Sequence, residues 1–178
     1  MMNKKNLPHI ITVVSFVVFI VLGLASASAP DQTGTQSGTQ RRLYSAEDYY
    51  KRGQENSKNG NYELAIEDYT EVIRLGSNNN AMAAAGYNAR AWIYAYYMKT
   101  NYDRALADAN QALRLAPNNA SYLDTRGWVY LGKGDYNNAN DDFFKALQID
   151  PNMNSSKEGL EKIREAQAEE VIDWSEFE

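Results

Sequence analysis

Histidine and cysteine, which serve many proteins as nucleophiles, general bases and zinc ligands, are nearly missing from this sequence. Its one histidine is His9, and it contains no cysteine. For the chain that follows His9, this composition excludes histidine-based triads, cysteine nucleophiles and zinc sites built on imidazole or thiolate. Carboxylates are plentiful, but their spacing marks out no catalytic pair. A carboxylate-based hydrolase is therefore the least favoured function, and we expect no enzyme activity.

A cluster of acid and amide side chains carries the oxygen ligands that Ca²⁺ prefers. The cluster comprises Asn137, Asn138, Asn140, Asp141 and Asp142. The spacing of an EF-hand loop and its closing glutamate are not there. On a helix such residues more often form a solvated face, so we predict neither a metal site nor a cofactor.

A repeated sequence pattern indicates which structural elements position any functional side chain. The stretch Ala120–Pro151 recurs twice upstream, less clearly the second time. The residues in phase are Tyr62, Tyr102 and Tyr136, then Ala65, Ala105 and Ala139, then Val72, Ala112 and Ala146. In each first half a small residue follows an arginine: Gly53 after Arg52, Ala91 after Arg90 and Gly127 after Arg126. Small side chains on facing helices let the two axes approach closely.

A self-similar period of about 34 residues, which the second and third copies show, resembles the tetratricopeptide repeat family. The resemblance implies an all-α, right-handed superhelical solenoid of three helix pairs plus a C-terminal capping helix. We predict repeats at about 45–78, 84–118 and 119–152, within 45–153, and a capping helix at 154–170. The second repeat has two extra residues relative to the third, which we place in the turn region Tyr96–Thr100.

Polar residues between the helices predict how the second helix of each pair begins. Asn61, Asn101 and Asp135 each precede one of these helices and can cap unpaired backbone N–H groups. The three arginines are in phase with the repeat. We therefore expect them to make structural contacts rather than to bind a ligand.

In the family that this chain resembles, the first helices line the inner surface and contact peptides. Helical phase then selects the candidate site, which is Tyr50, Gln54, Asn88, Trp92, Tyr96, Asp124 and Trp128. No lysine or arginine is among them, so the cationic clamp that such grooves use for chaperone carboxylates is not expected. An aromatic, weakly acidic groove suits apolar or proline-containing peptides. The alternative, that the aromatic stripe belongs to the core, is favoured for Trp128 and balanced for Trp92.

The segment 1–29 differs in kind from the rest of the chain. Two lysines precede an apolar run from Ile10 to Leu24, and small residues follow. This pattern is typical of a secretory signal peptide, so we predict an exported protein, periplasmic or secreted. The alternative is an uncleaved anchor formed by residues 7–29, which reaches the roughly 20 residues that span a bilayer. Residues 30–44 are rich in small and polar types and are predicted to be a flexible linker.

The formal net charge is −5, so broad attraction to nucleic acid is not expected. The segment 171–178 combines acids with Trp174 and Phe177, and it is predicted to be a tail that binds a partner or the groove of another copy. The equally weighted alternative is that both rings fold back onto the closing helix. The function that we expect is a non-catalytic scaffold that binds a protein or peptide outside the cytoplasm. The alternative is a membrane-anchored structural component that self-associates through the tail and the groove.

Overall fold

The computed structural model of the chain describes residues 44–172. All described residues belong to one compact unit, Arg41–Glu178. The predicted signal peptide, nearly all of the predicted linker and residues 173–178 of the predicted tail lie outside the described residues. Within residues 44–172, no helix has the length and apolar character that crossing a membrane requires.

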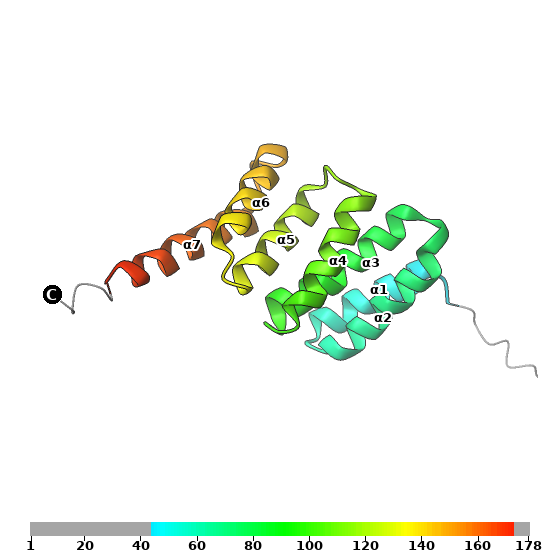
Figure 1. Cartoon of the computed structure of the whole chain (residues 1–178). Helices are drawn as coiled ribbons and strands as arrows, with labels where there is room; N and C mark the ends of the chain where they lie inside the picture. The colour runs from blue at the N-terminus through cyan, green and yellow to red at the C-terminus, as the bar shows by residue number, and fades with distance from the viewer. Residues whose placement is uncertain (1–43, 173–178) are drawn as a thin grey trace, which may run out of the picture. The chain divides into compact units, whose positions relative to one another are not determined.

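Every regular element in the described part of the chain is helical. The elements are α1 (Ala46–Lys58), α2 (Tyr62–Leu75), the short 3₁₀ turn η1 (Gly76–Asn78), α3 (Asn80–Trp92), the π-helical turn η2 (Ile93–Tyr97), α4 (Tyr102–Leu115), α5 (Ala120–Gly132), α6 (Tyr136–Ile149) and α7 (Asn154–Ile172). Consecutive helices pack in pairs, α1 with α2, α3 with α4 and α5 with α6, and α7 follows the last pair (Figure 1). The predicted helix pairs and closing helix are therefore confirmed.

Polar side chains cap the first backbone N–H groups of several helices. At the start of α1, Asp48 N–H donates to the Ser45 hydroxyl at 3.1 Å, and Ser45 N–H donates to the Asp48 carboxylate at 3.0 Å. Of the three residues predicted to cap the second helices, Asp135 does so, accepting a backbone N–H at 3.2 Å. Asn61 and Asn101 make no such bond, so that prediction is wrong for them. Asn101 instead turns the chain into α4 through a left-handed backbone with a φ of 51°.

The first helix of the second repeat absorbs part of the insertion. The turn Ile93–Tyr97 is π-helical, and Met98 N–H donates to Ile93 C=O at 3.0 Å, a step of five residues instead of four. Beyond it, Lys99 has a left-handed φ of 49°. The sequence predicts the insertion at Tyr96–Thr100, whereas the structure begins it earlier, because a π turn takes in an extra residue without ending the helix.

Within each helix pair, the size of a residue on the first helix complements the size of the residue that it faces on the second. Gly127 faces Phe143 closely enough that a Cβ at Gly127 would lie 2.6 Å from the ring. The first pair uses the same combination of glycine and aromatic ring. In the middle pair Ala91 takes the glycine position, and the small Ala109 takes the position of the ring. The pairs thus close to helix-packing distance by complementary substitutions.

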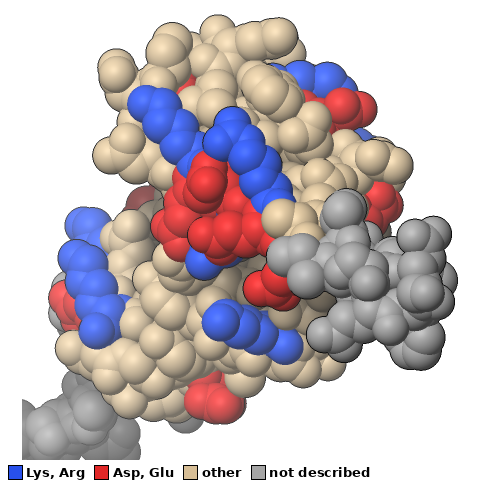
Figure 2. Space-filling model, turned by 90° about the vertical axis from the view of Figure 1, so that its left-hand side faces the viewer, with Lys and Arg blue, Asp and Glu red and all other residues tan. Residues whose placement is uncertain are grey.

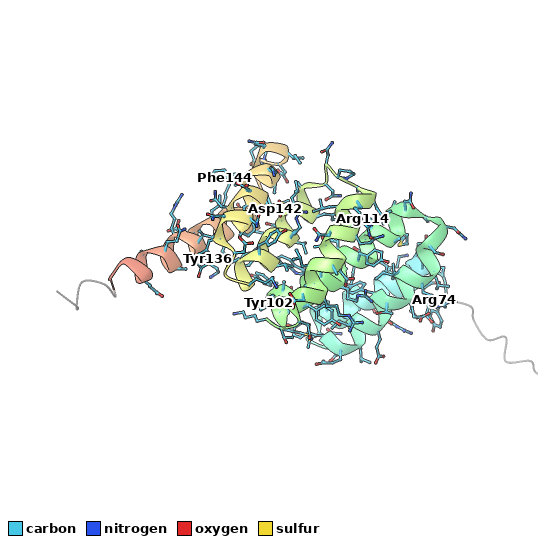
Figure 3. The ribbon with its side chains drawn as sticks, viewed as in Figure 1. Arg74, Tyr102, Arg114, Tyr136, Asp142 and Phe144 are labelled. Atoms are coloured by element: carbon cyan, nitrogen blue, oxygen red, sulfur yellow. The ribbon has the colours of Figure 1, made fainter. Side chains whose placement is uncertain are left out.

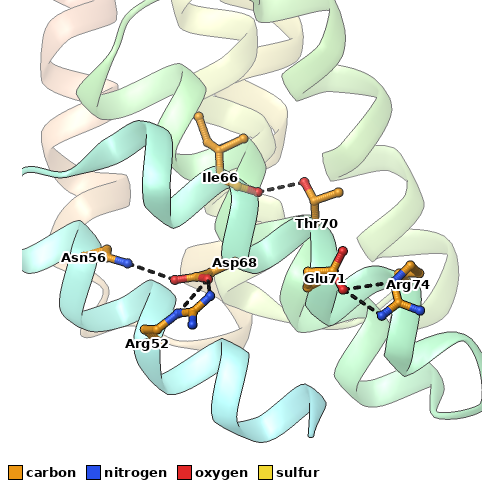
Figure 4. Close-up of polar contacts among 7 residues, drawn as sticks. All are labelled: Arg52, Asn56, Ile66, Asp68, Thr70, Glu71 and Arg74. Atoms are coloured by element: carbon orange, nitrogen blue, oxygen red, sulfur yellow. Dashed lines mark hydrogen bonds and ion pairs between the residues drawn. The ribbon is translucent and has the colours of Figure 1, made fainter. Parts of the chain in front are cut away.

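Each arginine of the repeat is paired with an aspartate on the second helix of its own pair. The pairs are Arg52–Asp68, Arg90–Asp108 and Arg126–Asp142. Arg90 is the most buried of the three and donates to both oxygens of Asp108, at 2.8 and 2.9 Å. Figure 4 shows the first pair, in which Asn56 also donates to Asp68 at 2.9 Å.

The second and third arginines also contact the preceding pair. Arg90 donates to Thr70 Oγ1 at 2.8 Å, and Arg126 donates to Asn110 Oδ1 at 2.9 Å. Both acceptors lie on the second helix of the preceding repeat. The structural role predicted for these arginines is therefore confirmed, because they join neighbouring repeats.

Asp142 departs from the solvated face predicted for its cluster. It is buried, and its carboxylate accepts two hydrogen bonds from Arg126, which offset the cost of burying the charge. Figure 3 labels Asp142 on α6 together with Phe144, a residue that is 51% exposed. Within the described residues, no three His, Cys, Asp or Glu side chains lie together as a metal site requires.

Candidate functional site

A hollow of about 290 Å³ between α1 and α3 brings together four of the seven predicted site residues, namely Tyr50, Gln54, Asn88 and Trp92. The other lining residues are Ser57, Lys58, Tyr69, Ala89, Ile93 and Tyr97. We refer to the whole set as the α1–α3 groove. It lies where successive first helices of the solenoid face each other.

Aromatic rings form much of the groove wall. Tyr50 packs against Tyr69 with ring centroids 5.7 Å apart. Tyr97 stacks on Tyr62 at 4.9 Å and meets the ring of Trp92 edge-on at 6.4 Å. Tyr97 is the last residue of the π turn, so the insertion helps to form this wall. Such a surface can stack on an apolar, aromatic or proline side chain.

Asn88 contributes a hydrogen-bond acceptor that no protein group uses. Its Oδ1 is the one buried side-chain nitrogen or oxygen within residues 44–172 that has no hydrogen-bond partner. Leaving a buried acceptor unpaired costs roughly 1–3 kcal/mol. The Asn88 side chain as a whole is only partly buried and lines the groove, so its amide lies where it can hydrogen-bond to the backbone of a bound peptide.

Asp124 and Trp128, which are also predicted to lie in the groove, are instead covered by the start of α7. They are only 6% and 7% exposed. Ser155 and Ser156 donate to the two oxygens of Asp124 at 2.7 and 2.6 Å, and Trp128 Nε1 donates to Ser155 at 2.9 Å. The groove is therefore not acidic, and Trp128 belongs to the core, as the alternative interpretation holds.

Trp92 and Tyr96 each pack against other aromatic rings and also line a hollow. Their rings stack at 4.4 Å with an interplanar angle of 10°. Tyr96 also meets the ring of Trp128 edge-on at 4.9 Å. Trp92 thus packs on the core and lines the α1–α3 groove, whereas Tyr96 lines a second hollow.

This second hollow, of about 370 Å³, lies where η2, α5 and α7 meet. We name this hollow the α5–α7 pocket. It is lined by Ala95, Tyr96, Lys99, Tyr102, Trp128, Leu131, Gly132, Glu158 and Lys162. The lysines of both hollows are absent from the predicted site. Lys58 lies one turn beyond Gln54 at the end of α1, and Lys99 and Lys162 lie outside the first helices that carry the stripe. The break in the repeat period near Tyr96 is the one sequence signal of the pocket.

The buried carboxyl of Asp124 makes stability depend on pH. Burial raises the pKa of Asp124 above its ordinary value of 3.8, and the hydroxyls of Ser156 and Ser155 lower it in part. The folded state then binds the proton more tightly, so this contribution is fully present below pH 3.8 and is lost as pH rises through the raised pKa. We therefore expect the free energy of unfolding of Asp124→Asn, measured relative to that of wild type, to increase as the pH rises from about 4 to about 7.

Urea unfolding at the two pH values measures this difference. Asp141→Asn, at an exposed position on α6, is the control that separates burial from a simple loss of charge. A relative stability of Asp124→Asn that falls with rising pH would contradict the assignment.

Comparison with known proteins agrees with this architecture. The tetratricopeptide repeat model matches residues 46–82 and 120–153, on either side of the pair that contains the insertion. Heat shock protein STI1 of Saccharomyces cerevisiae is 29% identical over 122 residues, which is 68% of this chain and 20% of that protein. The chain spans about a fifth of the length of such curated relatives.

Solved domains show the same fold. The first TPR domain of human RPAP3 is 25% identical with a TM-score of 0.62, covering 70% of this chain and 93% of that domain. The second TPR domain of human RPAP3 was solved in complex with the HSP70 peptide SGPTIEEVD. It is 30% identical with a TM-score of 0.57, and the match covers 67% of this chain and 94% of that domain. The predicted all-α, right-handed solenoid is confirmed, and the chain belongs to the tetratricopeptide repeat family.

Proposed function

We propose that the chain is a non-catalytic scaffold whose α1–α3 groove holds an extended peptide segment of a partner protein outside the cytoplasm. The observation that carries this proposal is Asn88, a buried acceptor without a partner on the wall of an aromatic groove. A similar domain has been solved with a bound peptide, which supports peptide binding by the same architecture.

The lining of the groove favours a largely uncharged segment. Trp92 and Tyr97 offer rings for stacking, Gln54 and Asn88 offer amides for backbone hydrogen bonds, and Lys58 is the one charged lining residue. A peptide with aromatic or proline residues fits this chemistry. The acidic peptide SRMEEVD, bound by the first TPR of Spaghetti (RPAP3), is expected to bind weakly here, since Lys58 is the single cation of the groove lining.

The test uses the unit Arg41–Glu178, which contains all the described hydrophobic clusters. Peptides are selected on this unit from a displayed random library, and their affinities are measured by calorimetry, with SRMEEVD as the comparison. We expect Asn88→Ala to weaken the selected peptides about tenfold, the effect of roughly 1.4 kcal/mol that one lost hydrogen bond gives.

Phe144→Ala, an exposed change on α6, serves as the matched control and should leave the affinity unchanged. Selected peptides that bind equally well to wild type, Asn88→Ala and Trp92→Ala would place the site elsewhere. Unchanged circular dichroism for each variant separates lost binding from lost folding.

The export part of the proposal rests on residues 1–29. The intact mass of the protein recovered from its native location tests it. A mass that matches a chain beginning at Pro30 supports a cleaved signal peptide and an exported scaffold. A full-length mass in the membrane fraction supports the alternative, a membrane-anchored assembly component.

A further inference from the structure

The α5–α7 pocket is separate from the α1–α3 groove and has a different chemistry. Tyr96 and Trp128 give it aromatic walls, and Tyr102 packs so closely against Gly132 that a Cβ at this glycine would overlap the ring. The glycine therefore keeps Tyr102 in the lining of the pocket. A volume of about 370 Å³ is near the lower end of the range of about 300–1,000 Å³ for ligand sites, which suits a large side chain.

Two lysines give this pocket a positive charge. Lys162 lies 3.7 Å from Glu158, a long contact between two exposed residues one helical turn apart. Lys99 forms no ion pair with any residue in 44–172. With one acid against two cations, the pocket favours an acidic ligand, and its walls favour an aromatic one.

One face of the molecule carries charges of both signs. Figure 2 shows acidic side chains gathered near the centre of the face that it views, with lysines and arginines around them. A surface of mixed sign produces no broad field that would attract acidic chains. The preference for an acidic aromatic ligand comes from the lining residues of the pocket.

The chain contains a segment with the required chemistry. Residues 173–178 read Asp-Trp-Ser-Glu-Phe-Glu, three acids alternating with two aromatic residues and with no lysine or arginine. This segment directly follows α7, the helix that contributes Glu158 and Lys162 to the pocket.

Helix α7 leads the chain away from the pocket of its own copy. Leu160 lies midway between Glu158 and Lys162, and the twelve residues of helix from there to Ile172 extend about 18 Å. Trp174 lies two residues further on, which a chain spans in at most about 7 Å. Entry into the pocket of its own copy would require the tail to double back along α7, whereas a tail from another copy has no such restriction.

We propose that the α5–α7 pocket receives the segment 173–178 of a second copy of this chain. The Trp174 ring enters against Tyr96 and Trp128, while Glu176 and Glu178 face Lys99 and Lys162. Each copy offers one pocket and one tail, so a reciprocal exchange closes as a dimer. This assembly leaves the α1–α3 groove free for the peptide.

Sedimentation of the unit Arg41–Glu178 over a concentration series tests the proposal. We expect a dimer for wild type, a monomer after deletion of residues 173–178, and at least a tenfold weaker association for Trp174→Ala. A monomeric wild type at every concentration, or a dimer that survives the deletion, would overturn the proposal.

Charge reversal locates the contact. Lys99→Glu with Lys162→Glu should dissociate the dimer, and adding Glu176→Lys with Glu178→Lys should restore it. Lys145→Glu with Lys157→Glu, two exposed lysines outside the pocket, is the matched control and should remain dimeric. Dissociation by the control pair, or no restoration in the quadruple variant, would contradict the assigned contact.

A labelled peptide of residues 171–178 gives a second readout that does not depend on dimer formation. It should bind the tail-deleted unit and lose this binding on Lys99→Glu with Lys162→Glu. Binding that persists in this variant would move the tail to another surface. Asn88→Ala should affect neither experiment, so failure of this proposal and failure of the peptide-binding proposal are distinguishable.

Discussion

Asp108→Asn is expected to lower the free energy of unfolding by about 3–5 kcal/mol, the usual cost of removing one partner from a buried ion pair. The side chains of Arg90 and Asp108 are only 10% and 7% exposed. Loss of the carboxylate leaves the guanidinium buried without a neutralising charge. The neutral amide of the variant and the hydrogen bond to Thr70 supply acceptors, but no charge to neutralise the guanidinium.

The equivalent change in the first repeat provides the control. Asp68→Asn removes the same carboxylate, but the side chain of Arg52 is 48% exposed and water can solvate it. We therefore expect a loss of about 1 kcal/mol or less, as for ion pairs near the surface. Urea unfolding followed by circular dichroism measures both variants. Equal losses would show that burial of the arginine does not determine the effect.

Phe143→Ala should also destabilise the chain by about 3–5 kcal/mol, the range for removal of a buried phenylalanine. Phe143 is fully buried, with Gly127 on one side and Gly159 of the closing helix on the other. Without the ring, the third helix pair and α7 lose their common contact. A thermal or urea unfolding experiment measures the change.

The neighbouring Phe144 is the matched control for this prediction. Phe144→Ala removes the same side chain from an exposed position and should change the free energy of unfolding by no more than about 0.5 kcal/mol. A similar loss for the two variants would mean that α6 packs in a different orientation.

A double-mutant cycle then tests the fit between glycine and ring. Gly127→Ala places a Cβ against Phe143 and should cost about 1–3 kcal/mol in the wild type. In the Phe143→Ala background the same change should cost less, because the ring is gone and the pair resembles Ala91 and Ala109 of the middle repeat. Strictly additive losses would contradict the proposed contact.

The repeated pattern by itself determined the fold class, the three helix pairs and the closing helix. Glycine or alanine recurs after an arginine in each first helix, and alanine recurs in each second helix. Such periodic positions report the contacts inside one helix pair, which are local in sequence and similar in every copy. The structural role of Arg90 and Arg126 followed from the same periodicity.

Only the tertiary structure decided which predicted site residues are accessible. Asp124 and Trp128 lie in the same helical phase as exposed residues, yet Ser155 and Ser156 cover them from α7, which α6 separates from α5 in the sequence. The π turn at Ile93–Tyr97 likewise changes which rings face the groove. Helical phase defines one face of a helix, but burial of that face depends on how neighbouring repeats and the closing helix stack, and this stacking has no periodic signal in the sequence.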